Sequence, residues 1–173
     1  MDIEQRIISA AEFSFDHNGF TASGMDKLTA AANVSSRTLY KRLGNKNNLM
    51  AAVLAHRRQR FFSALDGASI DEIFAQLASW SESEGARGCL FLRALSDAGT
   101  SIDEVAAEVT VYRKELHLLI TRLVRSETGD GNAVEAMLVL FEGAVAAASY
   151  RGVGAIHVAR TAAAVLLNES SER

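Results

Sequence analysis

Hydrophobic residues recur at helical spacing from the first turn of the chain. The stripe consists of Ile3, Ile7, Ala11 and Phe15, which lie four residues apart and so fall on one side of an amphipathic helix. Gly19 follows this stripe, and glycine commonly ends a helix because it adopts the left-handed conformation without steric cost. The pattern predicts a first helix that ends at Gly19 and buries its apolar stripe.

The next segment, residues 25–48, has the pattern of two short helices joined by a tight turn. The turn passes through Asn33, where a left-handed residue is needed, and asparagine tolerates that conformation better than any residue except glycine. Ser35 or Ser36 is a natural N-cap for the second helix. Leu39 then faces back onto the first helix of the pair, so the second helix has one apolar side.

The second helix of the pair keeps hydroxyl groups, one aromatic ring and three cations on its outer side. These residues are Ser35, Ser36, Arg37, Thr38, Tyr40, Lys41 and Arg42. A short cationic helix of this kind fits the major groove of DNA, where side chains reach the edges of the bases. The segment is therefore predicted to be a helix-turn-helix.

The same segment resembles the DNA-binding domain of the TetR/AcrR family of bacterial transcription regulators. The family pattern is a small residue followed by G-V-S, three variable positions, L-Y, a basic or aromatic residue, F, two further residues and K. The corresponding residues here are Ala32, Asn33-Val34-Ser35, Leu39-Tyr40, Leu43 and Lys46. Asn33 replaces the usual glycine, Leu43 the usual phenylalanine, and Gly24 the usual cap of the first helix of the pair. These changes affect the angle of the turn and remove no expected contact to DNA.

The resemblance implies DNA contacts for a set of residues in this segment. Tyr40 and Lys46 correspond to the family's contacts to phosphates, and Arg37 is able to clamp a guanine at two acceptor atoms. Lys27 and Lys41 are open to two interpretations, as contacts to the DNA backbone or as solvated lysines. The full set is Lys27, Ser35, Ser36, Arg37, Thr38, Tyr40, Lys41, Arg42 and Lys46.

The remainder of the chain continues the helical pattern. Capping boxes at residues 69–72 and 101–104 each start a helix, because the serine and the glutamate three residues later satisfy N–H groups at a helix start. The expected helices run over about 47–65, 69–80, 89–95, 102–126, 132–150 and 154–168. The chain has no proline, and about nine helices are expected in all. The fold class is all-α, with an N-terminal three-helix helix-turn-helix head (residues 1–46). A helical bundle for ligand binding and dimerisation (residues 47–173) follows, with the helix 47–65 as connector.

The composition indicates a cytoplasmic globular protein. The chain has 173 residues, 49% of them hydrophobic, which suffices for a sizeable core. The single cysteine, Cys89, excludes a disulfide within the chain and suggests a reducing compartment. The N-terminus lacks the basic and apolar regions of a signal peptide. The most apolar segment, around residues 137–150, is too short to span a bilayer, so no membrane association is expected.

Charge is divided unevenly along the chain, whose formal net charge is −3. Residues 21–60 hold eight cations against one acid, a net of +7, whereas residues 61–173 hold nine cations against sixteen acids, a net of −7. A basic N-terminal part on an acidic body suits a protein that presents one surface to phosphates. Arg57, Arg58 and Arg60 are interpreted as a solvated helix face, and the cluster from Arg37 to Lys46 as the DNA surface.

The resemblance also implies a homodimer. In the family, the last two helices of each subunit form a four-helix interface, which here corresponds to about residues 132–168. Small residues such as Gly143 and Ala147 let helices approach closely. The alternative is that both helices lie inside the core of one chain. A dimer is favoured because two heads about 34–36 Å apart read a near-palindromic site.

Relatives bind a small-molecule effector among their middle helices, which shifts the connector helix. The chemical identity of an effector for this chain is not indicated by any motif. Candidate lining residues are Phe61, Phe62, Phe74, Trp80, Phe91, Arg93, Tyr112, His117 and Phe141. Each of these residues is more often ordinary core than a ligand contact. Arg93 and His117 are the better polar anchors, because their charge is unusual in a core.

The predicted function is that of a TetR-type transcriptional regulator, a ligand-responsive repressor that binds a double-stranded operator as a dimer. An enzyme is not expected, because the chain lacks a G-x-S-x-G motif, a phosphate-binding glycine loop and a histidine pair at metal-binding spacing. No cofactor and no metal are expected. The alternative is a helical ligand-binding or adaptor module without sequence-specific DNA binding, against which Tyr40 and Lys46 argue.

Overall fold

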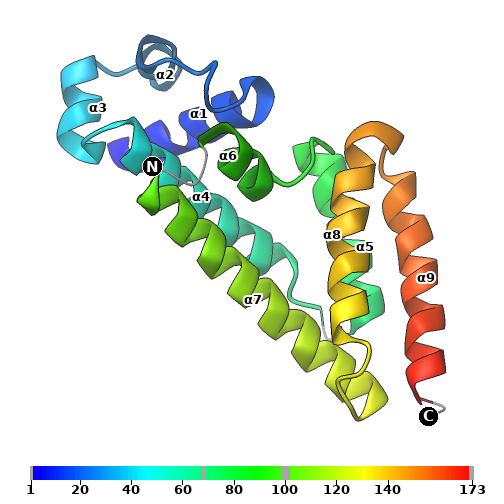
Figure 1. The fold of residues 1–173 in the computed structure, drawn as a ribbon. Helices are drawn as coiled ribbons and strands as arrows, with labels where there is room; N and C mark the ends of the chain where they lie inside the picture. Colours follow the sequence, from blue (N-terminus) through cyan, green and yellow to red (C-terminus); the bar gives the residue numbers. More distant parts are fainter. Residues whose placement is uncertain (1, 68, 99–101, 172–173) are drawn as a thin grey trace. The chain divides into compact units, whose positions relative to one another are not determined.

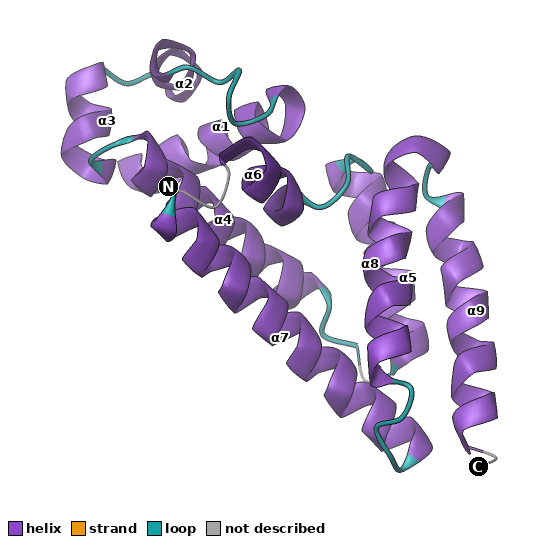
Figure 2. Ribbon diagram, in the orientation of Figure 1, coloured by secondary structure: helices purple, strands orange, loops and turns teal. Residues whose placement is uncertain are grey.

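The computed structural model describes residues 2–67, 69–98 and 102–171, and the regular structure in these ranges is helical (Figure 1, Figure 2). Nine helices occur within them. Their bounds are α1 Ile3–Asn18, α2 Met25–Ala32, α3 Ser36–Leu43, α4 Lys46–Ala64, α5 Ile70–Glu84, α6 Leu90–Ala98, α7 Asp103–Thr128, α8 Val134–Arg151 and α9 Gly154–Ser171. The predicted all-α fold class is confirmed.

The helix ends follow local signals in the sequence. Gly19 ends α1 with a φ of 82°, and its N–H donates to the carbonyl of Phe15 at 2.9 Å. Ser69 accepts a hydrogen bond from the N–H of Glu72 at 3.1 Å, as the first capping box predicts. The second capping box begins at Ser101, which lies outside the described residues.

The chain forms two compact units. The first unit contains the residues up to Arg60 together with Leu90–Tyr112, and the second contains Phe61–Cys89 and the residues from Arg113 onward. Both α4 and α7 contribute residues to each unit. The first unit thus contains α6 as well as the helix-turn-helix. The sequence pattern instead divides the chain at residue 46, and this division by function stays a prediction.

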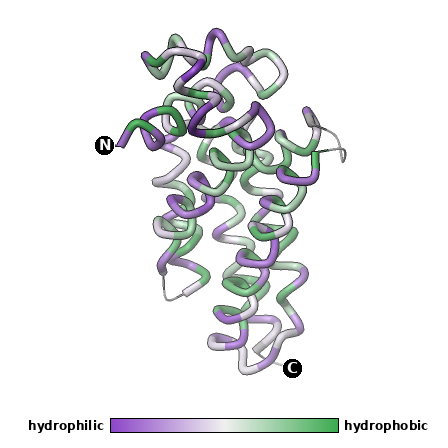
Figure 3. Tube along the Cα trace, turned by 90° about the vertical axis from the view of Figure 1, so that its left-hand side faces the viewer, coloured by the Kyte–Doolittle hydropathy of each residue, from purple (hydrophilic) through white to green (hydrophobic). Residues whose placement is uncertain are grey.

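The core of the first unit is built on the apolar stripe of α1. Ile7 and Phe15 on this stripe are fully buried, and Leu28 of α2 and Leu39 of α3 are buried as well. Phe20 folds back so that its ring stacks on that of Phe15, with the centroids 4.6 Å apart. Burial of each such side chain contributes roughly 1.5–3 kcal/mol, so α1 supports the two helices that follow it. Hydrophobic and hydrophilic stretches follow one another along the helices, as expected for amphipathic helices that bury one side (Figure 3).

The turn between α2 and α3 depends on one residue in the left-handed conformation. Asn33 has a φ of 51°, the only positive φ at a non-glycine residue in the described part of the chain. The N–H groups of Asn33 and Val34 donate to the carbonyls of Ala30 and Thr29, both at 3.1 Å. These bonds satisfy carbonyls at the end of α2 and turn the chain toward α3.

The second unit is organised around α9, which packs against both α5 and α8. Phe74 of α5 meets Phe141 of α8 edge to face, with the ring centroids 5.4 Å apart. The guanidinium of Arg160 on α9 donates two hydrogen bonds to the carboxylate of Asp71 on α5, at 2.6 and 2.5 Å. An aromatic contact and a two-point ion pair therefore connect three helices that are distant in sequence.

We expect Asn33→Ala to destabilise the protein by about 1 kcal/mol, because the left-handed conformation costs a residue with a Cβ roughly 1–2 kcal/mol. Asn33→Gly is the matched control and should be neutral or stabilising, since glycine adopts this φ freely. Urea unfolding followed by circular dichroism measures both changes. Equal destabilisation by alanine and glycine would show that the asparagine side chain, and not its φ, is what the turn requires.

The Asp71–Arg160 ion pair should make stability depend on pH. The hydrogen bond from Arg160 lowers the pKa of the Asp71 carboxyl below its ordinary value of 3.8. A carboxyl with a lowered folded-state pKa contributes stability above its unfolded-state pKa and loses it as the pH falls through the folded-state value. Asp71→Asn should therefore lower the urea midpoint slightly at pH 7, and this difference should disappear at a pH well below 3.8.

The effect of this substitution should be small because both side chains are largely exposed. The double variant Asp71→Asn with Arg160→Gln is the control, and it should lose no more stability at pH 7 than either single variant. A fully additive loss would show that the two side chains act separately.

Candidate nucleic-acid interface

Helix α3 begins with a side-chain cap and has one apolar side. The hydroxyl of Ser35 accepts a hydrogen bond from the N–H of Thr38 at 3.1 Å and shares a bond of 2.9 Å with the Thr38 hydroxyl. Of the two caps that the sequence allows, the structure has Ser35. Leu39 and Leu43 are buried, so the opposite side of α3 faces solvent.

The residues expected to contact DNA lie mainly on exposed surface. On α3, Tyr40 is 47% exposed, whereas Thr38 is partly buried. The exposed members of the set are Lys27, Ser35, Ser36, Arg37, Tyr40, Lys41 and Arg42. Apart from Lys27, which is on α2, the structure brings these cations, hydroxyls and the phenol together along α3 and its cap. A surface of this composition is able to donate hydrogen bonds to bases and phosphates.

Lys46 is the first residue of α4 and is partly buried. Burial lowers the pKa of its ammonium group, and the Asp97 carboxylate opposes this effect by favouring the charged form. The positive end of the α4 dipole lies at the same place. A phosphate at the start of α4 would therefore meet both the ammonium and the N–H groups of the first helical turn.

The interpretation of Arg57, Arg58 and Arg60 as a solvated helix face is wrong. The Arg57 side chain is 8% exposed, and its guanidinium pairs with Glu12 at 3.3 Å and with Asp16 at 3.0 Å. Arg60 pairs with Glu12 at 2.8 Å, and Arg58 lies 3.5 Å from an acid of α7. All three cations are engaged by acids within the first unit, because burial makes an unpaired charge strongly unfavourable.

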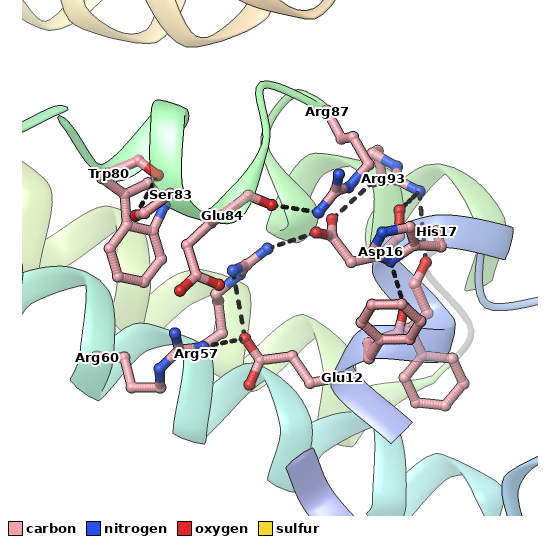
Figure 4. Close-up of polar contacts among 12 residues, drawn as sticks. Glu12, Asp16, His17, Arg57, Arg60, Trp80, Ser83, Glu84, Arg87 and Arg93 are labelled. Carbon is pink, nitrogen blue, oxygen red and sulfur yellow. Dashed lines mark hydrogen bonds and ion pairs between the residues drawn. The ribbon is translucent and has the colours of Figure 1, made fainter. Parts of the chain in front are cut away.

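Glu12 and Asp16 are structural residues that the hydrophobic pattern does not single out, and Figure 4 shows arginines converging on them. They directly follow Ala11 and Phe15 on α1, and both are almost completely buried. Two carboxylates that are buried beside an apolar stripe need cationic partners. Their position next to the stripe is the sequence signal that could have indicated their burial.

The charge count over residues 21–60 includes Arg57, Arg58 and Arg60, which pair with acids of the protein. The remaining cations of this range lie between residues 25 and 46. Between residues 25 and 46 the only acid is Asp26. The cations of this stretch are Lys27, Arg37, Lys41, Arg42 and Lys46. The basic surface is therefore concentrated on α3 and on the helix starts or turns next to it in sequence.

The aromatic residues expected around an effector fall into separate groups. One stacked pair lies in the first unit and the other contacts lie in the second. The contacts are Phe91–Tyr112, Phe61–Phe62, Phe61–Trp80 and Phe74–Phe141, with ring centroids 4.0, 5.5, 5.5 and 5.4 Å apart. Aromatic packing of this kind is typical of protein cores, and the effector role of these residues stays a prediction.

The two expected polar anchors have protein partners. The guanidinium of Arg93 pairs with the carboxylate of Asp16 at 3.1 Å in the first unit. The imidazole of His117 lies 3.5 Å from the carboxylate of Glu135 in the second unit, and the histidine side chain is 52% exposed. An ion pair thus accounts for the partial burial of Arg93 without a ligand.

A second exposed surface is apolar and lies on α8 and α9. Val139 and Val158 are 70% and 71% exposed. Both line a groove of about 630 Å³ between the two helices, where Gly143, Ala147 and Ala155 leave room. Single exposed apolar residues are ordinary, but a contiguous apolar patch marks an interaction surface.

Within the described ranges, no group of three or more histidine, cysteine, aspartate or glutamate side chains is placed to hold a metal ion. Among the helices that the structure describes, none combines the length and the apolar content needed to cross a membrane.

Residues 7–53 match the family model of bacterial regulatory proteins of the tetR family. No curated protein sequence matches the chain. The fold is similar to the crystal structure of a TetR-family transcriptional regulator from Streptomyces coelicolor, with a TM-score of 0.84, 22% sequence identity and coverage of 98% of this chain and 96% of that one. A putative TetR regulator from Streptomyces avermitilis gives a TM-score of 0.82 at 21% identity, with 98% of each chain covered.

A TetR-like transcriptional regulator from Rhodococcus sp. is 25% identical, with a TM-score of 0.71 and coverage of 95% of this chain and 93% of that one. The family match covers most of α1, all of α2 and α3 and the start of α4, and the structural similarities extend over nearly the whole chain. The N-terminal part of the chain therefore matches the tetR family model, and the chain as a whole has the fold of TetR-family transcriptional regulators.

Proposed function

We propose that the protein is a ligand-responsive repressor that binds a near-palindromic operator as a homodimer. The observation that carries the proposal is the exposed side of α3, where Arg37, Tyr40, Lys41 and Arg42 face away from the buried Leu39. A short helix with this polarity suits the major groove. The match of residues 7–53 to the tetR family model supports the proposal, because TetR regulators bind operators and usually dimerise.

The proposed contacts divide into two kinds. Arg37 reads bases, since its guanidinium is able to donate two hydrogen bonds to a guanine. The Tyr40 hydroxyl and the Lys46 ammonium bind phosphates, which fixes the orientation of the protein on the duplex without reading sequence. Ser36 and Arg42 extend the base-reading surface or contact the adjoining backbone. Affinity then depends mainly on the second kind of contact, and sequence preference on the first.

The homodimer is proposed to form through α8 and α9. Exposed valines and the groove between these helices give an apolar surface whose burial is favourable in water. The glycine and alanines of the groove allow the helices of a second copy to pack closely. Two-fold symmetry matches the symmetry of a palindrome, and it requires the two α3 helices to be about 34–36 Å apart on DNA.

A small-molecule effector is proposed to alter DNA binding. Such control requires the effector to bind two conformations with different affinities, a coupling of about 1–3 kcal/mol. Phe61, Phe62 and Trp80 in the second unit offer aromatic side chains of the type that line such sites.

Retention of fragmented genomic DNA by the purified protein separates this proposal from its alternative. Enrichment of one near-palindromic sequence supports the regulator. The absence of any enriched sequence would favour an adaptor or ligand-binding module without sequence-specific DNA binding.

Replacing Lys46 with alanine should weaken binding to all DNA sequences alike. If the dimer neutralises roughly eight phosphates, the logarithm of affinity falls with that of salt concentration at a slope of about −7. Loss of one phosphate contact per subunit should make this slope less steep by about 2. Fluorescence anisotropy at several salt concentrations measures the slope.

Lys114→Ala, which removes an exposed cation from α7, is the matched control and should leave the slope unchanged. An unchanged slope for Lys46→Ala would remove this residue from the phosphate contacts.

Replacing Val158 with glutamate should convert the homodimer to a monomer, because a charge in a buried apolar interface is strongly unfavourable. Light scattering after size-exclusion chromatography measures the mass. Leu118→Glu is the control, since Leu118 is 67% exposed on α7, and this variant should stay dimeric. A dimer that survives Val158→Glu would place the interface elsewhere.

A further inference from the structure

Two charged residues of α6 contact the end of α1 and the residue that follows it. Arg93 and Asp97 lie one helical turn apart on α6, and both belong to the first unit. A guanidinium nitrogen of Arg93 donates to the carbonyl of Asp16 at 3.0 Å and reaches that of Phe15 at 3.4 Å. Carbonyls in the last turn of a helix lack partners within the helix, and a cation there also complements the helix dipole. Arg93 therefore caps the C-terminal end of α1.

Asp97 holds the first residue beyond that end. Its carboxylate accepts a hydrogen bond from the N–H of Phe20 at 2.9 Å. A side chain at Gly19 would place its Cβ 3.2 Å from the same carboxylate, so the chain and α6 approach each other closely at this point. Phe20 is fully buried and stacks on Phe15. The Asp97 contact therefore fixes a backbone position that is also held by the core.

The same end of α1 is held from α4. The carboxylate of Asp16 lies between the guanidinium of Arg93, at 3.1 Å, and that of Arg57, at 3.0 Å (Figure 4). One turn earlier, Glu12 pairs with His56 and Arg60 of α4, both at 2.8 Å. Charged side chains of α4 and α6 thus converge on the last two turns of α1.

The segment that begins at Gly19 leads directly into α2 and then α3. Within this segment the hydroxyl of Ser23, which is fully buried, donates to the carbonyl of Gly19 at 2.8 Å and shares a hydrogen bond with the hydroxyl of Ser14 at 3.0 Å. The segment 19–24 is short and contains the hydrogen bond between Ser23 and Gly19. The position of Phe20 therefore determines where α2 begins. The direction of α2 in turn determines the direction of α3 through the turn at Asn33.

We infer that Arg93 and Asp97 are positioning residues for DNA binding, which act by fixing residues 19–24 and hence the orientation of α2 and α3. Helix α6 then contributes to DNA binding, in addition to carrying candidate residues of an effector site. This inference rests on the proposed function for its effect on DNA, but the contact itself is testable on the protein alone.

The first experiment measures backbone hydrogen exchange at Phe20 in the full-length protein without DNA. Asp97→Ala removes the acceptor, and exchange at this amide should become about tenfold faster. Asp97→Asn keeps an acceptor oxygen and should restore slow exchange. Ser96→Ala is the control, because the Ser96 hydroxyl bonds only within α6 in the contacts that the structure describes. Unchanged exchange in Asp97→Ala would overturn the inference, whatever the protein does with DNA.

The second experiment compares binding to the sequence enriched from genomic DNA with binding to an unrelated duplex. Base contacts need an accurately oriented α3, whereas phosphate contacts tolerate a change of angle. Asp97→Ala should therefore weaken specific binding about tenfold and non-specific binding less than about threefold, with an unchanged salt slope. Asp97→Asn should bind the specific sequence about as tightly as the parent, because it keeps an acceptor oxygen for the N–H of Phe20.

A merely structural role predicts a different result. Loss of stability alone would lower the fraction of active protein in a stoichiometric titration without changing the ratio of specific to non-specific affinity. If Asp97→Ala does not fold, Asp97→Glu moves the acceptor by one methylene and should lower the same ratio. An unchanged ratio in the folded variants would overturn the positioning role. If the parent enriches no sequence, the proposed function fails, and the exchange measurement still decides whether α6 holds residues 19–24.

Discussion

The buried ion pairs of Glu12 and Asp16 are the constraint on which the first unit depends. Two carboxylates almost excluded from solvent require cations, and the chain supplies them from α4 and α6. Attraction between buried charges is offset by the cost of removing them from water, so such pairs add less to stability than their geometry implies. Their stronger effect is on arrangement, because any packing of α1 that separates them leaves a buried charge without a partner. The network thus favours one arrangement of α1, α4 and α6.

This constraint also explains how an acidic chain presents a basic surface. Arginines of α4 are used inside the unit, whereas those of α3 face solvent. Both sets lie in the same basic stretch of sequence, yet only the second remains available for phosphates. Net charge along residues 21–60 therefore overstates the exposed basic surface, whose cations lie mainly on α3 and next to it in sequence. The proposed dimer through the apolar face of α8 and α9 would supply a second α3 helix, and a single short helix reads too few bases to be selective alone.

Features that follow local rules could be predicted from the sequence. The stripe from Ile7 to Phe15, the end of α1 at Gly19 and the left-handed Asn33 each depend on a few adjacent residues, and all are present. The exposed side of α3 follows from the same periodicity. The pairing of Arg57 with Glu12 and Asp16 could not be predicted in this way, since it joins residues about 40 positions apart whose meeting depends on tertiary packing. The contacts of α6 with the end of α1 are more remote still, and no periodicity in α6 indicates them.

The two sets of arginines differ in their access to dissolved ions. Cations on α3 are surrounded by water, so counterions screen them over about 10 Å at 0.1 M ionic strength. The guanidinium of Arg57 is enclosed with its carboxylates, where mobile ions do not enter. Raising the salt concentration should therefore detach the protein from a nucleic acid long before it loosens the helices that carry the binding surface.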